Sequence, residues 1–180
     1  MNDDIRIFET TKIRLIARIQ IMQIREIKKE DNPQIESVIR SVFLELNLPL
    51  TGTAYADPET SMMFEAYDAP KSIYFVVEFE GEILGGAGIK PLKNYDETVC
   101  ELQKMYALPK MRGQGIGQKL MDHCLNAARS FGFKQCYLET TPELKAAIKL
   151  YKHNDFLEID AQLGDTGHHS CGVWMIKKLT

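Results

Sequence analysis

Three glycines stand within five residues of one another, directly before a segment with strong helical periodicity. They are Gly113, Gly115 and Gly117, and the apolar residues that follow are spaced as on one face of a helix. Because glycine destabilises helix interiors, such a cluster indicates that a ligand approaches the backbone closely. A strand, a glycine loop and a helix start bring N–H groups and the positive end of a helix dipole together. The sequence therefore predicts an anion site, and a phosphate group is its usual ligand.

The chain is long enough for one domain with a substantial core. It has 180 residues, of which 44% are hydrophobic, and a chain of this size needs no disulfides for stability. The net charge of −3 comes from 22 basic and 25 acidic residues, without a long run of either sign. This pattern favours neither nucleic acid nor an anionic membrane as a partner. No segment has the pattern of a signal peptide or a membrane span, so we expect a cytoplasmic protein with reduced cysteines.

Strand and helix patterns alternate along the chain, which is typical of an α/β fold. Strand patterns cover residues 19–27, 98–108, 134–140, 156–162 and 171–178, and a hairpin at 72–92 turns at 80–82. Helical patterns cover residues 30–46, 59–67, 116–131 and 141–154, with Asp31 or Asn32 and later Thr141 as caps. Gly85 and Gly86 predict that the second strand of the hairpin is weakened or bulged there. We expect one domain at residues 19–180, preceded by a dispensable extension at residues 1–18.

Three nucleotide-binding motifs compete as explanations of the glycine cluster. The P-loop pattern GxxxxGK[ST] does not occur, so that class is excluded. A dinucleotide fingerprint needs GxGxxG, and the chain has GxGxG, although Glu139 ends the next strand where a ribose-binding acid would lie. A dinucleotide oxidoreductase therefore stays as an alternative. The third pattern, Arg-x-x-Gly-x-Gly, is met by Arg112, Gly115 and Gly117.

This third motif and its surroundings resemble the GCN5-related N-acetyltransferase (GNAT) superfamily. The segment "LQKMYALPKMRGQGIGQKL" has that family's order of apolar strand, proline and Arg-Gly, and "AAIKLYKHNDF" is similar to its later helix with a tyrosine. The glycine that usually precedes the phenylalanine there is Asp155, a residue type that tolerates the left-handed conformation. The resemblance covers most of the chain. It implies a mostly antiparallel central sheet of about six to seven strands, flanked by about four helices.

In that family the glycine loop holds the pyrophosphate of acetyl-CoA, and the pantetheine arm binds the main chain of the preceding strand. The resemblance assigns the arm to Met105, Tyr106 and Ala107, and the pyrophosphate to Arg112, Gly113, Gln114, Gly115, Ile116 and Gly117. Acetyl-CoA is therefore the expected cosubstrate, and transfer of acetyl to a primary amine is the expected activity. A non-catalytic module that senses acyl-CoA is the alternative from another class.

Acetyl transfer from a thioester to an amine requires a base, stabilisation of an oxyanion and a proton for the thiolate. Glu101 is the first candidate for the base, because histone-acetylating members of the family carry a base glutamate on the fourth strand. Glu139 is the second candidate, and Tyr151 matches the family's general acid. Cys100 adjoins Glu101 but faces the opposite side of the strand, so we expect direct transfer rather than an acetyl-cysteine.

The acceptor amine is expected opposite the CoA arm, between residues 48–67 and residues 163–171. Tyr55, His168 and His169 are the candidate substrate-binding residues in these segments. Both segments carry acidic residues and neither has a lysine or arginine, which predicts a small-molecule or peptidyl amine with additional positive charge. The two histidines and Cys171 are too close along one loop to converge on an ion, so we expect no metal. The sequence leaves a homodimer open.

Overall fold

The structure is a computed structural model that describes residues 22–167 and 170–179. The proposed extension at residues 1–18, and both His168 and His169, lie outside these ranges. Within the described ranges, every helix is too short or too polar to cross a bilayer.

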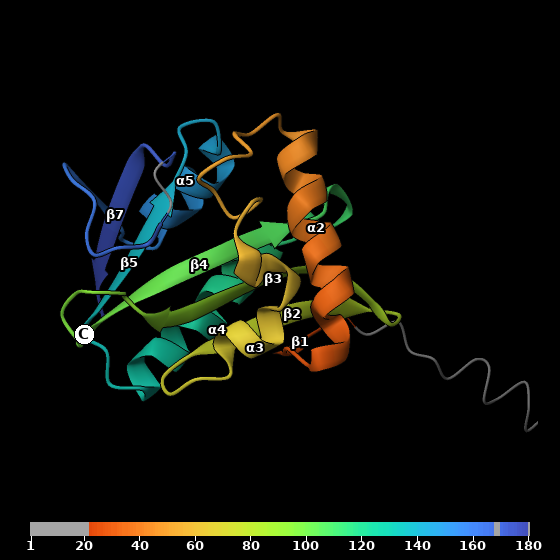
Figure 1. Ribbon diagram of the computed structural model, residues 1–180, viewed down its shortest axis with the longest axis horizontal. Coiled ribbons are helices and arrows are strands. Elements are labelled where there is room, and N and C mark those ends of the chain that lie inside the picture. Colours follow the sequence, from red (N-terminus) through yellow and green to blue (C-terminus); the bar gives the residue numbers. More distant parts are fainter. Residues whose placement is uncertain (1–21, 168–169, 180) are drawn as a thin grey trace, which may run out of the picture.

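One seven-stranded sheet forms the centre of the molecule (Figure 1). In sheet order its strands are β1 (Gln23–Glu26), β2 (Ile73–Phe79), β3 (Glu82–Pro91), β4 (Val99–Ala107), β5 (Gln135–Thr140), β7 (Val173–Lys178) and β6 (Leu157–Ile159). Neighbouring strands run antiparallel except β4 and β5, which are parallel. The helices are α2 (Asn32–Glu45), α3 (Met63–Tyr67), α4 (Ile116–Ser130) and α5 (Lys145–His153), with short 3-10 turns η1 (Lys29–Asp31), η2 (Pro58–Ser61) and η3 (Pro109–Met111). The predicted fold class is confirmed.

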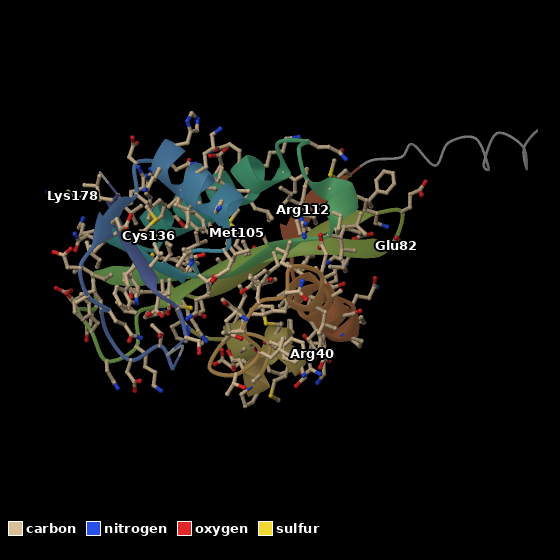
Figure 2. All side chains as sticks on the ribbon, turned by 90° about the horizontal axis from the view of Figure 1, so that it is seen from above. Arg40, Glu82, Met105, Arg112, Cys136 and Lys178 are labelled. Carbon is tan, nitrogen blue, oxygen red and sulfur yellow. The ribbon has the colours of Figure 1, made fainter. Side chains whose placement is uncertain are left out.

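The helices cover both faces of the sheet. Figure 2, seen from above, shows α4 and α5 on one face and α2 and α3 on the other. Ile35, Ile39 and Phe43 repeat at helical spacing along α2 and are buried on one side of the sheet. Leu120 and Cys124 do the same from α4 on the opposite side. Two apolar clusters therefore enclose the sheet and fix the positions of its central strands.

Two bulges interrupt the register in the middle of the sheet. β3 has an extra residue, Leu84, against β2 and next to Gly85, as the sequence predicted. The second bulge lies on β4, where Lys104 and Met105 together oppose only Ala87 of β3. Lys104 has a φ of +49°, a left-handed conformation that a lysine adopts only where its surroundings hold it. This second bulge was not predicted, because no glycine marks it.

The start of α5 differs from the prediction. The helix begins at Lys145 with Leu144 in the N-cap position and without a side-chain cap, so the prediction that Thr141 caps it is wrong. Residues 141–144 form a turn instead. At the other end of the helix, Asp155 has a φ of +60°, which is the left-handed conformation that the sequence indicated.

Asp31 ties β1 to the start of α2 rather than capping the helix with its side chain. Its carboxylate accepts hydrogen bonds from Arg25 Nη1 at 2.7 Å and Nη2 at 2.9 Å, and from the Lys28 N–H at 2.7 Å. Burial raises the pKa of Asp31, but these hydrogen bonds outweigh it and hold the pKa below its usual value.

Asp31→Asn should lower the free energy of unfolding by about 1.5–3 kcal/mol near neutral pH, because buried hydrogen bonds to a charged group are lost. A carboxyl group whose pKa is lowered by folding contributes stability above its unfolded pKa, and loses it as the pH falls through the folded pKa. The difference between the two proteins should therefore shrink below about pH 4 in urea unfolding. Glu82→Gln is the control, since Glu82 also pairs with a cation, Lys110 at 2.7 Å, but on the surface. An equal loss of unfolding free energy in Asp31→Asn and Glu82→Gln would contradict a special contribution of the buried Asp31 carboxylate.

Candidate functional site

β4 and β5 separate after a short stretch of parallel pairing. They are joined only from Val99 to Glu101, opposite Gln135 to Tyr137. Beyond this point β4 continues to Ala107, while β5 stays paired to β7 alone, and Figure 1 shows β4 and β5 diverging. The edge of β4 that faces β5 therefore has backbone N–H and C=O groups without a strand partner in the described chain. Such an edge can hold an extended ligand by main-chain hydrogen bonds.

A groove of about 480 Å³, which we call the loop groove, lies at this open edge. The second half of β4, the glycine loop, the start of α4 and one face of α5 line it, together with Val42 and Leu46 at the end of α2. Gly113 and Gly115 have φ values of +75° and +74°, and a Cβ at either would meet no atom within 4 Å. The first N–H groups of α4 lack intrahelical partners, and its first turn has no acidic residue. The loop therefore has the geometry that an anion needs.

Most of the residues expected to bind the cosubstrate line the loop groove. They are Met105, Tyr106, Ala107, Arg112, Gly113, Gly115, Ile116 and Gly117. Gln114 is not among them, because its side chain is exposed and donates to the Lys110 carbonyl at 2.7 Å.

Arg112 has a partner within the protein that the sequence did not reveal. Its Nη1 and Nη2 each lie 2.7 Å from a carboxylate oxygen of Glu45, at the end of α2, and its Nε donates to the Ala107 carbonyl at 3.1 Å. The guanidinium therefore connects α2 to the end of β4 while it lines the groove. Glu45 offsets part of the positive charge there.

A smaller hollow of about 50 Å³, which we call the central cavity, continues from the loop groove between the separated strands. The two share Met105, Tyr106, Leu144 and Tyr151 as lining residues. In the described part of the chain, three buried polar atoms on the wall of this cavity have no hydrogen-bond partner: Glu139 Oε2, Thr140 Oγ1 and Thr141 Oγ1. Buried polar groups are normally paired, so this cluster indicates a place for a polar ligand or water.

The three candidate catalytic residues meet at the central cavity. Glu101 comes from β4, is 2% exposed and accepts a hydrogen bond from Gln103 Nε2. Tyr151 comes from α5, and burial raises its pKa above the usual value for a phenol. Glu139 ends β5, and its Oε1 accepts hydrogen bonds from Tyr137 at 2.9 Å, Thr166 at 2.9 Å and Gln162 at 3.0 Å. The structure therefore places two carboxyl groups and one protonated phenol around one small space.

A third hollow of about 410 Å³, which we call the outer pocket, opens on the other side of the central cavity. The two share Thr53, Glu101, Gln103 and Lys104. The outer pocket lies between residues 52–59 and residues 165–167, inside the two segments expected to form the acceptor site. Ser170 holds these segments together, since its Oγ donates to the Thr51 carbonyl at 2.8 Å.

The lining of the outer pocket is not purely acidic, as the two loop segments alone had indicated. β3 and β4 bring Lys90 and Lys104 into it, and Lys93 follows β3. Lys104 Nζ lies 2.6 Å from Asp57 and 3.2 Å from Glu59, and Lys90 Nζ lies 2.7 Å from Glu59. The expectation of a lining without lysine is therefore wrong, because it counted loop residues and left out the strands beneath them.

Tyr55 does not line the outer pocket or the central cavity. Its ring packs against Phe43, with centroids 5.9 Å apart, and the Arg40 guanidinium lies 5.7 Å from the ring centroid. His168 and His169 lie outside the described residues. Among the residues that the structure does describe, no three His, Cys, Asp or Glu side chains gather as metal ligands would.

The sequence analysis missed several lining residues, among them the buried polar side chains of Gln103, Lys104, Thr140 and Thr141. One signal for Gln103 was present: Glu101 and Gln103 alternate as polar residues on one face of a strand predicted to be central. Lys104 had no such signal, because its inward orientation depends on the bulge.

Comparisons with known proteins agree with this geometry. The acetyltransferase (GNAT) family model matches residues 40–156. The uncharacterized N-acetyltransferase YjgM of Escherichia coli (strain K12) is 47% identical over 156 residues, which cover 86% of this chain and 93% of that relative. A GNAT-family acetyltransferase from Staphylococcus aureus Mu50 superposes with a TM-score of 0.76 at 19% identity, over 89% of this chain and all of that one.

A GNAT superfamily phosphinothricin acetyltransferase from Sinorhizobium meliloti, solved in complex with acetyl-CoA, superposes with a TM-score of 0.70. It is 21% identical, and the match covers 87% of this chain and 88% of that one. The chain therefore belongs to the acetyltransferase (GNAT) family. The predictions of an N-acetyltransferase and of acetyl-CoA as cosubstrate are confirmed at the level of the family.

Proposed function

We propose that this protein transfers the acetyl group of acetyl-CoA directly to a primary amine, on a small molecule or a peptide, in a ternary complex. The observation that carries the proposal is the row of three adjacent hollows that share lining residues, from the loop groove through the central cavity to the outer pocket. Tyr151 lines both the loop groove and the central cavity, and Glu101 lines both the central cavity and the outer pocket. The two groups suited to proton transfer therefore flank the space between donor and acceptor.

The loop groove fits acetyl-CoA on chemical grounds. The glycine loop and the α4 start offer N–H groups for a diphosphate, and the free edge of β4 at Met105, Tyr106 and Ala107 offers main-chain partners for a pantetheine arm. When bound, acetyl-CoA supplies an acetyl thioester. The narrow central cavity, which continues from the groove, has room for a group of acetyl size.

The chain's own residues divide the proton transfers between them. Glu101 is buried at the border of the outer pocket, where it can accept a proton from the attacking amine. Tyr151 stays protonated over the whole working pH range, because burial raises its pKa, and it holds a proton for the departing sulfur. Glu139 is the second candidate for the base, because it lines the same cavity and its buried Oε2 has no partner in the described chain.

Amine-dependent release of thiol tests the proposal. The protein is incubated with acetyl-CoA and a panel of amines that includes a polyamine, a lysine-like amine and an acidic amino acid, and free thiol is followed with time. Release that depends on both the amine and the protein is the expected result. Binding of acetyl-CoA without release for any amine would instead support an acyl-CoA sensor.

Tyr151→Phe should lower kcat by about 5–10-fold and leave the affinity for acetyl-CoA nearly unchanged, because the phenol acts when thiolate forms. The effect is modest because a thiol with a pKa of about 8.5 leaves without full protonation. Tyr95→Phe is the control, because Tyr95 is an exposed tyrosine outside the three hollows. Calorimetry measures the affinity for acetyl-CoA, and steady-state kinetics measure kcat. A loss of acetyl-CoA affinity as large as the loss of kcat would mark Tyr151 as structural.

A further inference from the structure

Three buried side chains form a hydrogen-bonded row that ends on Glu101. The Tyr67 hydroxyl, at the end of α3, donates to Gln103 Oε1 at 3.2 Å, and Gln103 Nε2 donates to Glu101 Oε2. Tyr67 and Gln103 are 4% and 9% exposed. We infer that Tyr67 is a positioning residue, which orients the Gln103 amide so that its N–H, and not its carbonyl, faces Glu101. The inference rests on the proposed role of Glu101 as the base.

The direction of the row follows from the chemistry of its members. An amide has an acceptor at one end and a donor at the other, so turning it over exchanges what it presents to its neighbours. A carboxylate accepts hydrogen bonds only, and it is favoured by an N–H and opposed by a carbonyl oxygen. Burial raises the pKa of Tyr67 well above its usual value, so the phenol keeps the proton that it donates. Each donor in the row then points toward the Glu101 carboxylate.

The backbone has a feature that lets this row form. Tyr67 reaches β4 across β3, and the residue beneath its ring is Gly88, which pairs with Gln103. A Cβ on Gly88 would lie 2.6 Å from Tyr67 Cε1, which is closer than a carbon contact allows. The ring is further held by Tyr74, with centroids 5.1 Å apart, and by Lys90 Nζ, 5.2 Å from its centroid. These contacts fix the ring independently of its hydroxyl.

Other titratable groups also surround Glu101. They are Lys104 of β4, Lys90 of β3, Lys93 after β3, Asp57 and Glu59 at η2, Cys136, Tyr137 and Glu139 of β5, Tyr151 of α5, and Cys171 and Asp165 before β7. Tyr67→Phe removes one hydroxyl and leaves all of these in place. A change in the pH profile of this variant therefore reports on the row itself.

Tyr67→Phe should move the acid limb of the kcat/KM profile upward by about 0.5–1 pH unit, with little change on the plateau. Without the phenol, the amide carbonyl has lost its donor, and the amide supports ionised Glu101 less well. Tyr74→Phe is the matched control, because it removes another buried phenol whose hydrogen bond, at 2.8 Å, goes to the Lys104 carbonyl. It should leave the position of the acid limb unchanged, whatever its effect on kcat.

A double-mutant comparison tests whether Tyr67 acts through Gln103. Gln103→Met should shift the acid limb at least as far as Tyr67→Phe, and the double variant should shift it no further than Gln103→Met alone. An unmoved acid limb in folded Tyr67→Phe, or a loss that is equal at every pH, would overturn the inference. If Tyr67→Phe does not fold, an unchanged position of the acid limb in Gln103→Met would overturn the inference instead. Failure of Glu101 as the base is distinguishable from failure of the Tyr67 inference. If Glu101 is not the base, Glu101→Gln leaves the acid limb of the pH profile in place.

Discussion

Glu101→Gln should lower kcat/KM for the acceptor amine by about 10²–10⁴-fold, which is the usual contribution of a positioned general base. The substitution keeps the size of a side chain that is 2% exposed, and its amide can still accept the hydrogen bond from Gln103. Loss of activity then reflects the missing carboxylate rather than a cavity in the core. The loss of kcat/KM should become smaller at high pH, because a free amine with a pKa of about 10.4 deprotonates there without help.

Two further carboxylates, one a control and one the second candidate for the base, complete this test. Glu158→Gln changes an exposed carboxylate on β6, paired with Lys152 at 3.4 Å and outside the three hollows, and it should retain activity. Glu139→Gln tests the second candidate for the base, since Glu139 lines the same cavity. A smaller loss than in Glu101→Gln is expected, because Oε1 of Glu139 is already held by three donors. A reversed order would assign the base to Glu139, and a pH-independent deficit in Glu101→Gln would contradict its role.

The parts of the fold that sequence could predict are those set by local periodicity. Helix α4 and strand β5 lie within a residue or so of their predicted bounds, because apolar spacing and flanking glycines act over a few residues. The glycine loop was predicted for the same reason, since Gly113 and Gly115 need the left-handed conformation that they have. Family resemblance then supplied the proposed roles of Glu101 and Tyr151, and the structure brings both residues to one cavity.

The parts that sequence could not predict depend on contacts between distant segments. Arg112 meets Glu45 across 67 positions in sequence, and no local pattern indicates that pair. Lys104 points into the outer pocket only because a bulge shifts β4 by one residue, and a one-residue shift exchanges the two faces of a strand. The outer pocket therefore has a mixed charge instead of the acidic lining predicted from its loops.

Gly115→Val should weaken acetyl-CoA binding by about 10–100-fold, or at least about 1.4 kcal/mol. The residue is the N-cap of α4 with a φ of +74°, and a Cβ there would meet no protein atom but would extend into open space beside the loop groove. The protein alone therefore accommodates the added atoms, whereas a diphosphate that approaches the N–H groups does not. A second cost comes from the left-handed backbone, which destabilises the fold by about 1–2 kcal/mol for a residue with a Cβ.

Gly81→Val separates these two effects. Gly81 lies in the β2–β3 turn with a φ of +86°, and a Cβ on it would also meet nothing within 4 Å, but it lies outside the loop groove. Both variants should show a similar fall in melting temperature, because both impose the same backbone strain. Only Gly115→Val should lose affinity for acetyl-CoA in calorimetry. Equal affinity in the two variants would remove the glycine loop as the diphosphate site, whereas the predicted difference would locate that site at the first turn of α4.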